Sequence, residues 1–157
     1  MARRFEPAYV DERCAESPAQ PLHFCAMSAP PGTRILLAED DDDLRELLTL
    51  RMEGAGHTVI SARDGVEALA LLDAAEPPAP RIIFTDWTMP RMDGLELARQ
   101  IRADQGSRVP IILFTAHDVR DMVELADLDI HFLVKTTPWT EVERTIHDLL
   151  TGTSSTA

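Results

Sequence analysis

Lysine and cysteine are nearly absent from this chain. Lys135 is the single lysine among 15 basic side chains, and the others are arginines. The two cysteines, Cys14 and Cys25, lie in the N-terminal part of the chain and form no recognisable metal-ligand pattern. So few cysteines argue against a disulfide framework and favour a reduced, cytoplasmic setting.

Long apolar runs and an excess of positive charge are also absent. No apolar run approaches the roughly 20 residues that a transmembrane helix needs. The opening stretch MARRFEPAYVDERCAESPAQ lacks the apolar segment of a signal peptide. The formal net charge of -12 argues against nonspecific binding to nucleic acid or to anionic membranes. We therefore expect a soluble protein with no nucleic-acid partner and no membrane partner.

The chain contains enough apolar sequence for one folded domain. Its 157 residues are 45% hydrophobic, which suffices for a buried core. Residues 1–32 contain five of the 11 prolines and no sustained hydrophobic period, which predicts a flexible extension. The domain is predicted to occupy residues 33–150, and residues 151–157 are predicted to be a disordered tail.

Short apolar runs alternate with helical patterns five times. The runs are typical of strands buried on both faces of a sheet. They occur at residues 34–39, 57–62, 81–86, 109–116 and 130–135. Five strand–helix repeats imply an α/β fold, with a doubly wound parallel sheet and right-handed connections.

Each helical pattern predicts an apolar face turned toward the sheet. The predicted inward residues are Leu44, Leu47 and Leu48, then Val66, Leu69 and Ala70, then Leu95, Ala98 and Ile101, then Val119, Met122 and Val123 in a short helix at 118–126, and finally Val142, Ile146 and Leu149. The last helix is predicted to begin with Thr137 as its N-cap and Pro138 at its first helical position.

Charged and polar side chains stand where the predicted strands end. Glu39 and the run Asp40 to Asp43 follow the first strand, Asp86 ends the third, Thr115 and His117 end the fourth, and Lys135 ends the fifth. In sheets of this kind, ligands bind at the carboxyl ends of the strands. Clustered carboxylates repel one another unless a cation joins them, and an oxygen ligand set suits Mg²⁺. Acidic residues also cap helix N-termini, so the run by itself leaves both interpretations open.

The complete set of side chains fits phosphoryl transfer to a carboxylate. Asp86 would be the nucleophile, and the Thr115 hydroxyl would donate a hydrogen bond to the phosphoryl group. Mg²⁺ and Lys135 would neutralise the charge on the phosphoryl oxygens. A compact ammonium on a slim stem suits a narrow site better than the planar fork of arginine, which explains one lysine in an arginine-rich chain.

Four short strings carry a resemblance to a known family. They are ILLAEDD, DWTMPRMDG, FTA and FLVK, in this order along the chain. Their order and spacing resemble the receiver domains of two-component response regulators over about residues 33–150. The resemblance implies a flavodoxin-like fold with the strand order 2-1-3-4-5.

The resemblance also implies a role for each matching residue. Glu39 and Asp40 would form the acidic pair, Asp86 would be the phosphoacceptor, the Thr88 carbonyl would complete the metal ligands, Thr115 would be the switch hydroxyl, Phe132 the switch aromatic residue, and Lys135 the phosphoryl-binding lysine. The implied cofactor is Mg²⁺, bound by Glu39, Asp40, Asp86 and the Thr88 carbonyl.

Partners follow from the same resemblance. A histidine kinase or a phosphotransfer protein would donate the phosphoryl group, a downstream protein would respond to it, and a homodimer stays open. No recognisable output domain follows Leu150. We therefore expect a stand-alone receiver that signals by protein–protein interaction or phosphorelay. It is not expected to be an enzyme, since it would catalyse only its own phosphorylation and dephosphorylation.

The sequence departs from the family pattern at three places. Thr136 follows the lysine where the family usually has proline, and Phe132 stands where tyrosine is common. The segment between Thr115 and Phe132 is shorter than usual. The missing proline keeps a second interpretation open, a degenerate receiver that takes no phosphate and serves as a docking module, although the complete set of acids, threonine and lysine argues against it.

Two other function classes share parts of the pattern. A flavodoxin-like cofactor binder would need a phosphate-binding loop after the first strand, where this chain has acids that repel phosphate. A hydrolase with an aspartyl nucleophile would use an acid pair such as Asp40 and Asp42, but it leaves Asp86 and Lys135 unexplained.

Overall fold

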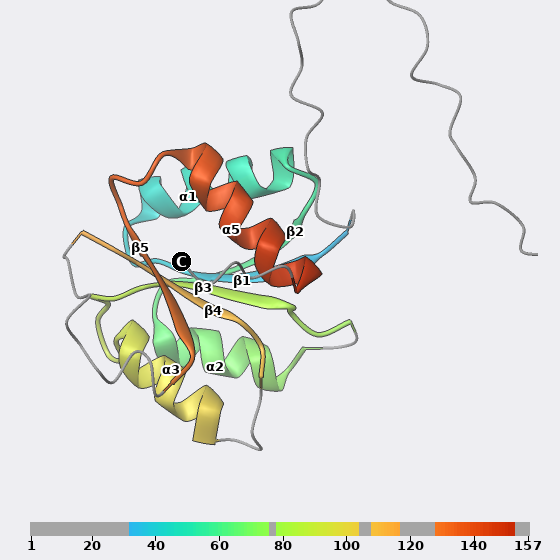
Figure 1. Cartoon of the computed structure of the whole chain (residues 1–157). Helices are drawn as coiled ribbons and strands as arrows, with labels where there is room; N and C mark the ends of the chain where they lie inside the picture. The colour runs from blue at the N-terminus through green and yellow to red at the C-terminus, as the bar shows by residue number, and fades with distance from the viewer. Residues whose placement is uncertain (1–31, 76–77, 104–107, 117–127, 153–157) are drawn as a thin grey trace, which may run out of the picture.

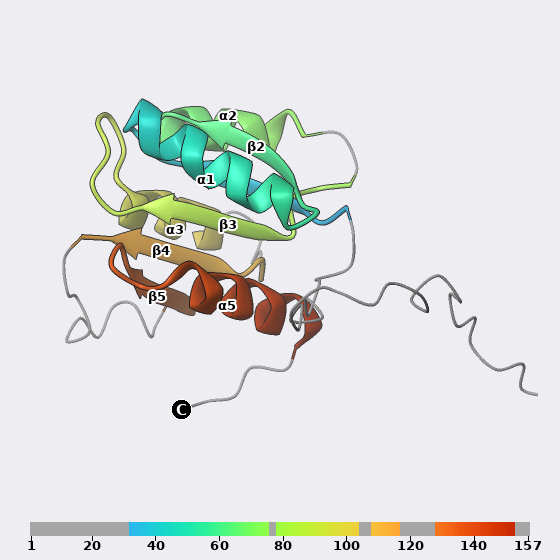
Figure 2. The ribbon, with the colours of Figure 1, turned by 90° about the horizontal axis from the view of Figure 1, so that it is seen from above.

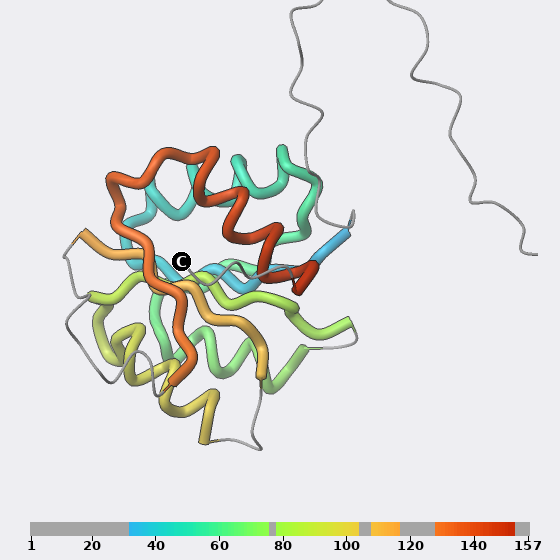
Figure 3. The backbone as a smooth tube through the Cα atoms, viewed as in Figure 1, coloured from blue at the N-terminus to red at the C-terminus, as the bar shows by residue number. Residues whose placement is uncertain are grey.

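The computed structural model describes residues 32–75, 78–103, 108–116 and 128–152. Most of the predicted extension, the last five residues, the predicted helix at 118–126 and His117 lie outside these residues. Within the described part, strands and helices alternate along the chain from β1 to α3, as the trace in Figure 3 shows.

Five parallel strands form one sheet in the order β2-β1-β3-β4-β5. The strands are β1 (Arg34–Ala38), β2 (Thr58–Ala62), β3 (Ile82–Asp86), β4 (Ile111–Thr115) and β5 (Ile130–Val134). Figure 2 shows β3, β4 and β5 pointing the same way. The predicted fold class and strand order are confirmed.

The burial of each strand explains its composition. All residues of β3 and β4 are buried, as are the last four of β1. A strand covered on both faces needs apolar side chains at every position, so these strands read as continuous apolar runs. The edge strands β2 and β5 are only partly buried, which fits Thr58 and Ser61 in β2 and His131 in β5.

Helices cover both faces of the sheet, with α1 and α5 on one face and α2 and α3 on the other (Figure 1). Their bounds are α1 (Asp42–Gly54), α2 (Gly65–Asp73), α3 (Gly94–Ala103) and α5 (Trp139–Thr151). Among the described residues, no helix is both long enough and apolar enough to cross a bilayer.

Two large apolar cores fill the layers between the sheet and its helices, and a smaller cluster forms around Leu95 and Leu113. The core beneath α1 and α5 includes Ile35, Leu37, Met52, Phe84, Phe114 and Ile146. The core beneath α2 and α3 includes Leu36, Ile83, Ala68, Leu97, Ala98 and Ile111. Neighbouring residues of one strand alternate between the two cores, which locks the register of each strand.

The predicted helix faces are right for α3 and partly wrong for α1 and α2. Leu47 is 46% exposed and Val66 41% exposed, and Ala70 is exposed as well. Leu48 and Met52 supply the buried face of α1, and Ala68 supplies that of α2. These helices carry apolar residues on several faces, so spacing alone did not fix which face turns inward.

The start of the last helix also differs from the prediction by one residue. Pro138 is the N-cap, with φ -56° and ψ 140°, and no side chain caps the helix. The Thr137 amide donates to the Val134 carbonyl at 2.8 Å, so Thr137 belongs to the preceding turn. Val142 and Ile146 are buried as predicted, whereas Leu150 is more deeply buried than Leu149.

His57, between α1 and β2, should make the fold sensitive to mild acid. Its Nδ1 is buried and has no hydrogen-bond partner among the residues that the structure describes. Burial lowers the pKa of His57, and the charge of Glu143 only partly opposes this. The unfolded chain therefore binds a proton first as the pH falls, so the stability is complete above the ordinary histidine pKa and is lost below it.

We expect the urea midpoint of the protein to fall between pH 7 and pH 5. His57→Gln, which cannot gain this proton, should show a smaller fall over the same range. An equal fall in both proteins would assign the acid sensitivity to other groups.

Candidate functional site

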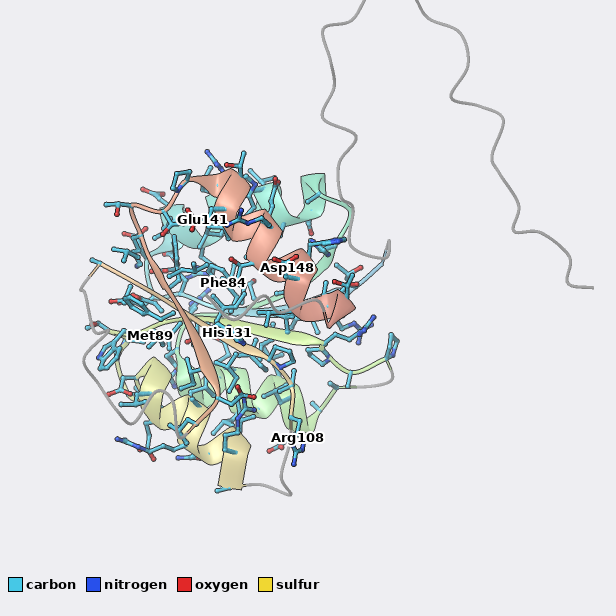
Figure 4. All side chains as sticks on the ribbon, viewed as in Figure 1. Phe84, Met89, Arg108, His131, Glu141 and Asp148 are labelled. Carbon is cyan, nitrogen blue, oxygen red and sulfur yellow. The ribbon has the colours of Figure 1, made fainter. Side chains whose placement is uncertain are left out.

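Polar residues gather at the edge of the sheet where the strands end. In Figure 4, Met89 marks this edge, because it lies in the loop after β3, and Arg108, which precedes β4, marks the opposite edge. Parallel strands bring all their carboxyl ends to one edge, so side chains that follow β1, β3, β4 and β5 meet there.

Three carboxylates form the centre of this edge. Glu39 and Asp40 follow β1, and Asp86 is the last residue of β3. Each offers a carboxylate oxygen, and these oxygens lie within 4.8 Å of one another. Glu39 and Asp86 are buried and Asp40 is exposed, so the triad is open to solvent on the side of Asp40.

Lys135 reaches into the same site from the end of β5. Its Nζ lies 3.1 Å from Oδ2 of Asp86 and donates to both carboxylate oxygens of Glu39 at 3.1 and 3.2 Å. The lysine amide also donates to the Thr115 carbonyl at 2.7 Å, which fixes the backbone from which the side chain extends. One ammonium therefore neutralises part of the charge of two buried carboxylates.

Burial and close contact shift the pKa values of Glu39 and Lys135. Burial raises the pKa of Glu39, the charge of Asp86 raises it further, and Lys135 only partly opposes both. Burial alone would lower the pKa of Lys135, but its hydrogen bonds to Asp86 and Glu39 outweigh that effect and raise the pKa. The lysine is thus held in its charged form, and the triad still carries more negative charge than the lysine balances.

Thr115 and Phe132 lie on the strands that border the triad. Thr115 ends β4 and is 1% exposed, and its neighbour Phe114 pairs with Asp86 in the sheet. Phe132 is half-buried in β5 and pairs with Leu113. Thr115 lies two positions beyond Leu113, so alternation along the strands puts Phe132 and Thr115 on the same face of the sheet.

The loop between β3 and α3 wraps closely around the end of Asp86. The Trp87 amide donates to Oδ1 of Asp86 at 2.7 Å, and the Gly94 amide donates to the Trp87 carbonyl at 2.9 Å. A side chain at Gly94 would overlap the Asp86 carbonyl oxygen, so only glycine fits there. Thr88, two residues beyond Asp86, is exposed in this loop.

The start of α1 shows which acids serve as caps. Asp41 is the N-cap, and its side chain accepts from the Leu44 amide at 2.9 Å. Asp42 forms an ion pair with Arg45, which also donates to the Glu39 carbonyl at 2.9 Å. Sequence reasoning missed Arg45, although its position three residues after Asp42 is a spacing at which helical ion pairs form.

The donor set of the triad fits a hard divalent cation. Three carboxylates lie close together, one of them is solvent-exposed, and the nearby lysine does not balance their charge. Burial is the main cause of the raised pKa of Glu39, and the charge of Asp86 raises it further, as expected of two carboxylates held close together. Oxygen ligands with an open side are what Mg²⁺ prefers, because it keeps several of its waters.

Comparison with known proteins agrees with this geometry. The family model for the response regulator receiver domain matches residues 35–146. The response regulator MprA of Mycobacterium ulcerans is 44% identical over 87 residues, which cover 55% of this chain and 36% of that protein. The matched part of the chain therefore spans little more than a third of the length of this relative.

Solved structures with the same fold cover more of the chain. The receiver domain of the Francisella response regulator 1452 is 25% identical, with a TM-score of 0.69, and the match covers 78% of this chain and 100% of that one. The response regulator TrrA of Thermotoga maritima, solved in complex with Mg²⁺ and BeF, is 28% identical, with a TM-score of 0.67 and coverage of 74% and 98%.

Proposed function

Because the chain belongs to the response regulator receiver family, which matches residues 35–146, we propose that Asp86 accepts a phosphoryl group from a histidine kinase or a phosphotransfer protein. The observation that carries this proposal is the contact of one ammonium, Lys135, with two buried carboxylates, Glu39 and Asp86, in a site that stays open at Asp40. A receiver domain is not a classical enzyme. The proposed reaction moves a phosphoryl group from the donor to Asp86 and turns over no other substrate.

The side chains around Asp86 supply what such a transfer needs. A carboxylate oxygen of Asp86 attacks the phosphorus atom, and the bond from phosphorus to the donor breaks with its electron pair leaving to the donor. Lys135 already contacts Asp86 Oδ2, so its charge is in place for the phosphoryl oxygens. The Thr115 hydroxyl, at the end of the neighbouring strand, donates to the same group.

Glu39, Asp40, Asp86 and the Thr88 carbonyl are the proposed Mg²⁺ ligands. The metal supplies positive charge that offsets the charge of the phosphoryl oxygens. The TrrA structure, in complex with Mg²⁺ and BeF, supports this assignment through the shared fold. After transfer, we propose that Thr115 and the Phe132 ring change position in response to the phosphoryl group, which alters the surface at β5.

The proposed output is a protein–protein contact or a further relay of the phosphoryl group. In this proposal the receiver acts in the cytoplasm, where it contacts a kinase, a downstream protein or a second copy of itself. The alternative is a degenerate receiver that only docks. It predicts the same fold but no modification of Asp86.

Intact-mass measurement separates these two functions. With Mg²⁺ and a small phosphodonor such as acetyl phosphate, the protein should gain about 80 Da, and hydroxylamine should remove the gain, as expected of an acyl phosphate. The gain should be absent with EDTA and in Asp86→Asn. A protein that never gains this mass is the docking module, and a stable gain that survives in Asp86→Asn contradicts the assignment.

Asp40 and Asp43 form a matched pair for testing the metal ligands. Both are exposed and lie three residues apart, but only Asp40 belongs to the triad. Asp40→Asn should weaken Mg²⁺ binding about tenfold or more, since a hard cation loses a charged oxygen. Asp43→Asn should change it little. Titration of Mg²⁺ against the emission of Trp87 measures both, and equal losses would place the site elsewhere.

A further inference from the structure

A third buried carboxylate, outside the triad, also contacts a cationic side chain. Asp64 precedes α2 and Arg91 lies in the loop after β3, 27 residues away. Nε of Arg91 donates to Oδ2 of Asp64 at 2.8 Å, and a second guanidinium nitrogen donates to the same oxygen. Asp64 is 2% exposed. The ion pair therefore joins the loop that follows Asp86 to the turn before α2.

Asp64 is held from both sides. Its Oδ1 accepts from the Val66 and Glu67 amides at 2.9 and 3.0 Å, which caps α2. Burial would raise the pKa of Asp64, but these amides and the Arg91 guanidinium outweigh it and lower the pKa. The carboxylate is thus charged and fixed, so it offers Arg91 a rigid anchor.

The backbone at Arg91 is unusual for a residue with a side chain. Arg91 has φ 65°, and the Met92 amide donates to the Pro90 carbonyl at 2.7 Å, which closes a three-residue turn. Glycine adopts a positive φ without cost, whereas other residues do so only where their surroundings hold them. The ion pair with Asp64 is one contact that holds Arg91 in place.

Met92 attaches the same turn to α2 a second time. The Gly65 amide donates to the Met92 carbonyl at 3.2 Å, and a Cβ at Gly65 would lie 2.6 to 2.9 Å from Met92 atoms. The Met92 side chain packs against the core beneath α2 and α3. Two successive residues of the acceptor loop therefore lie against the first turn of α2.

We propose that Arg91 is a positioning residue for the reaction at Asp86. Its ion pair with Asp64 holds the loop against α2, and this fixes the loop backbone that contains the proposed Thr88 carbonyl ligand. This rests on the proposed function, because the loop segment between Asp86 and Arg91 contains the proposed Thr88 ligand. The ion pair acts on Mg²⁺ binding through the backbone and does not touch the phosphoryl group.

Three variants isolate the ion pair. Arg91→Gly keeps the turn and removes the guanidinium, Asp64→Asn keeps an acceptor for the α2 cap and removes the charge, and the double variant combines both. Arg99→Ala is the matched control, because Arg99 forms an ion pair with Glu96 within α3 at 3.3 Å. The rate of mass gain from acetyl phosphate is measured against Mg²⁺ concentration, with urea unfolding alongside.

Each single variant should raise the Mg²⁺ concentration for half-maximal rate about tenfold, with the rate largely restored at saturating Mg²⁺. The double variant should be no worse than the more affected single variant, since both changes remove one interaction. Arg99→Ala should behave like the wild type. A purely structural role would lower the urea midpoint without this dependence on Mg²⁺.

The outcomes separate this inference from the function on which it rests. If the wild type gains no mass, the proposed function is wrong. If the wild type gains mass and Arg91→Gly and Asp64→Asn match it at every Mg²⁺ concentration, the function stands and the positioning role is overturned. Additive losses in the double variant, or an equal loss in Arg99→Ala, would also overturn it.

Discussion

Gly94→Ala should destabilise the protein by roughly 3 kcal/mol or more, because the added methyl group overlaps backbone that cannot move cheaply. The methyl carbon would overlap the Asp86 carbonyl oxygen and lie 2.9 Å from Leu113 Cδ1. Either Asp86 or the start of α3 must shift, so the variant should also lose most of its Mg²⁺-dependent mass gain. Urea unfolding and intact mass measure the two effects.

Gly54→Ala is the matched control for this substitution. Gly54 also lies at a helix end, but a Cβ there has no atom within 4 Å among the described residues. Its stability should stay unchanged or rise by up to about 1 kcal/mol, because alanine favours the helix. If Gly94→Ala proves as stable as Gly54→Ala, then Gly94 does not lie as close to the Asp86 carbonyl as the structure shows.

Lys135→Met should separate metal binding from phosphoryl transfer. Without the ammonium, Glu39 and Asp86 lose their shared partner, and the metal-free protein should lose about 2 kcal/mol of stability at neutral pH. The same loss leaves the triad more negative, so Mg²⁺ affinity should rise by about tenfold. The rate of mass gain should nevertheless fall about tenfold or more, since a cation that faces the phosphoryl oxygens is gone.

Lys135→Arg tests whether charge alone is enough. It restores the charge but places a broad planar group between two buried carboxylates, so stability and rate should recover only in part. The readouts are urea unfolding, Mg²⁺ titration and intact mass for all three proteins. A Lys135→Met variant with weaker Mg²⁺ binding would mean that the lysine helps to hold the metal ligands and does not compete with the metal.

The strands could be predicted from the sequence because burial leaves a direct mark on it. In β3 and β4 every residue is buried, so the apolar run and the strand coincide to within two residues. Which face of a helix is buried was harder to predict from the sequence. Leu47 and Leu48 are adjacent in α1, and only the position of the helix over the sheet decides that Leu48 is buried and Leu47 exposed.

The site was predictable where one side chain follows one strand. Topology alone brings Glu39, Asp86 and Lys135 to one edge, and the structure places them in contact. Contacts between loops were not predictable. The pairing of Asp64 with Arg91 depends on how closely two turns approach, which no spacing within either turn encodes.

Peptide mapping of the trapped adduct tests the central claim most directly. Tryptic cleavage after Arg81 and Arg91 releases IIFTDWTMPR, in which Asp86 is the only acidic residue. Borohydride reduction of an acyl phosphate gives the alcohol, so this peptide should become about 14 Da lighter after treatment with Mg²⁺ and acetyl phosphate. Phosphorylation of Asp86 predicts this shift in residues 82–91 and none in the peptide of residues 35–45, which contains Glu39 and Asp40. A shift in residues 35–45, or an unshifted 82–91 peptide from protein that gained the phosphoryl mass, would contradict it.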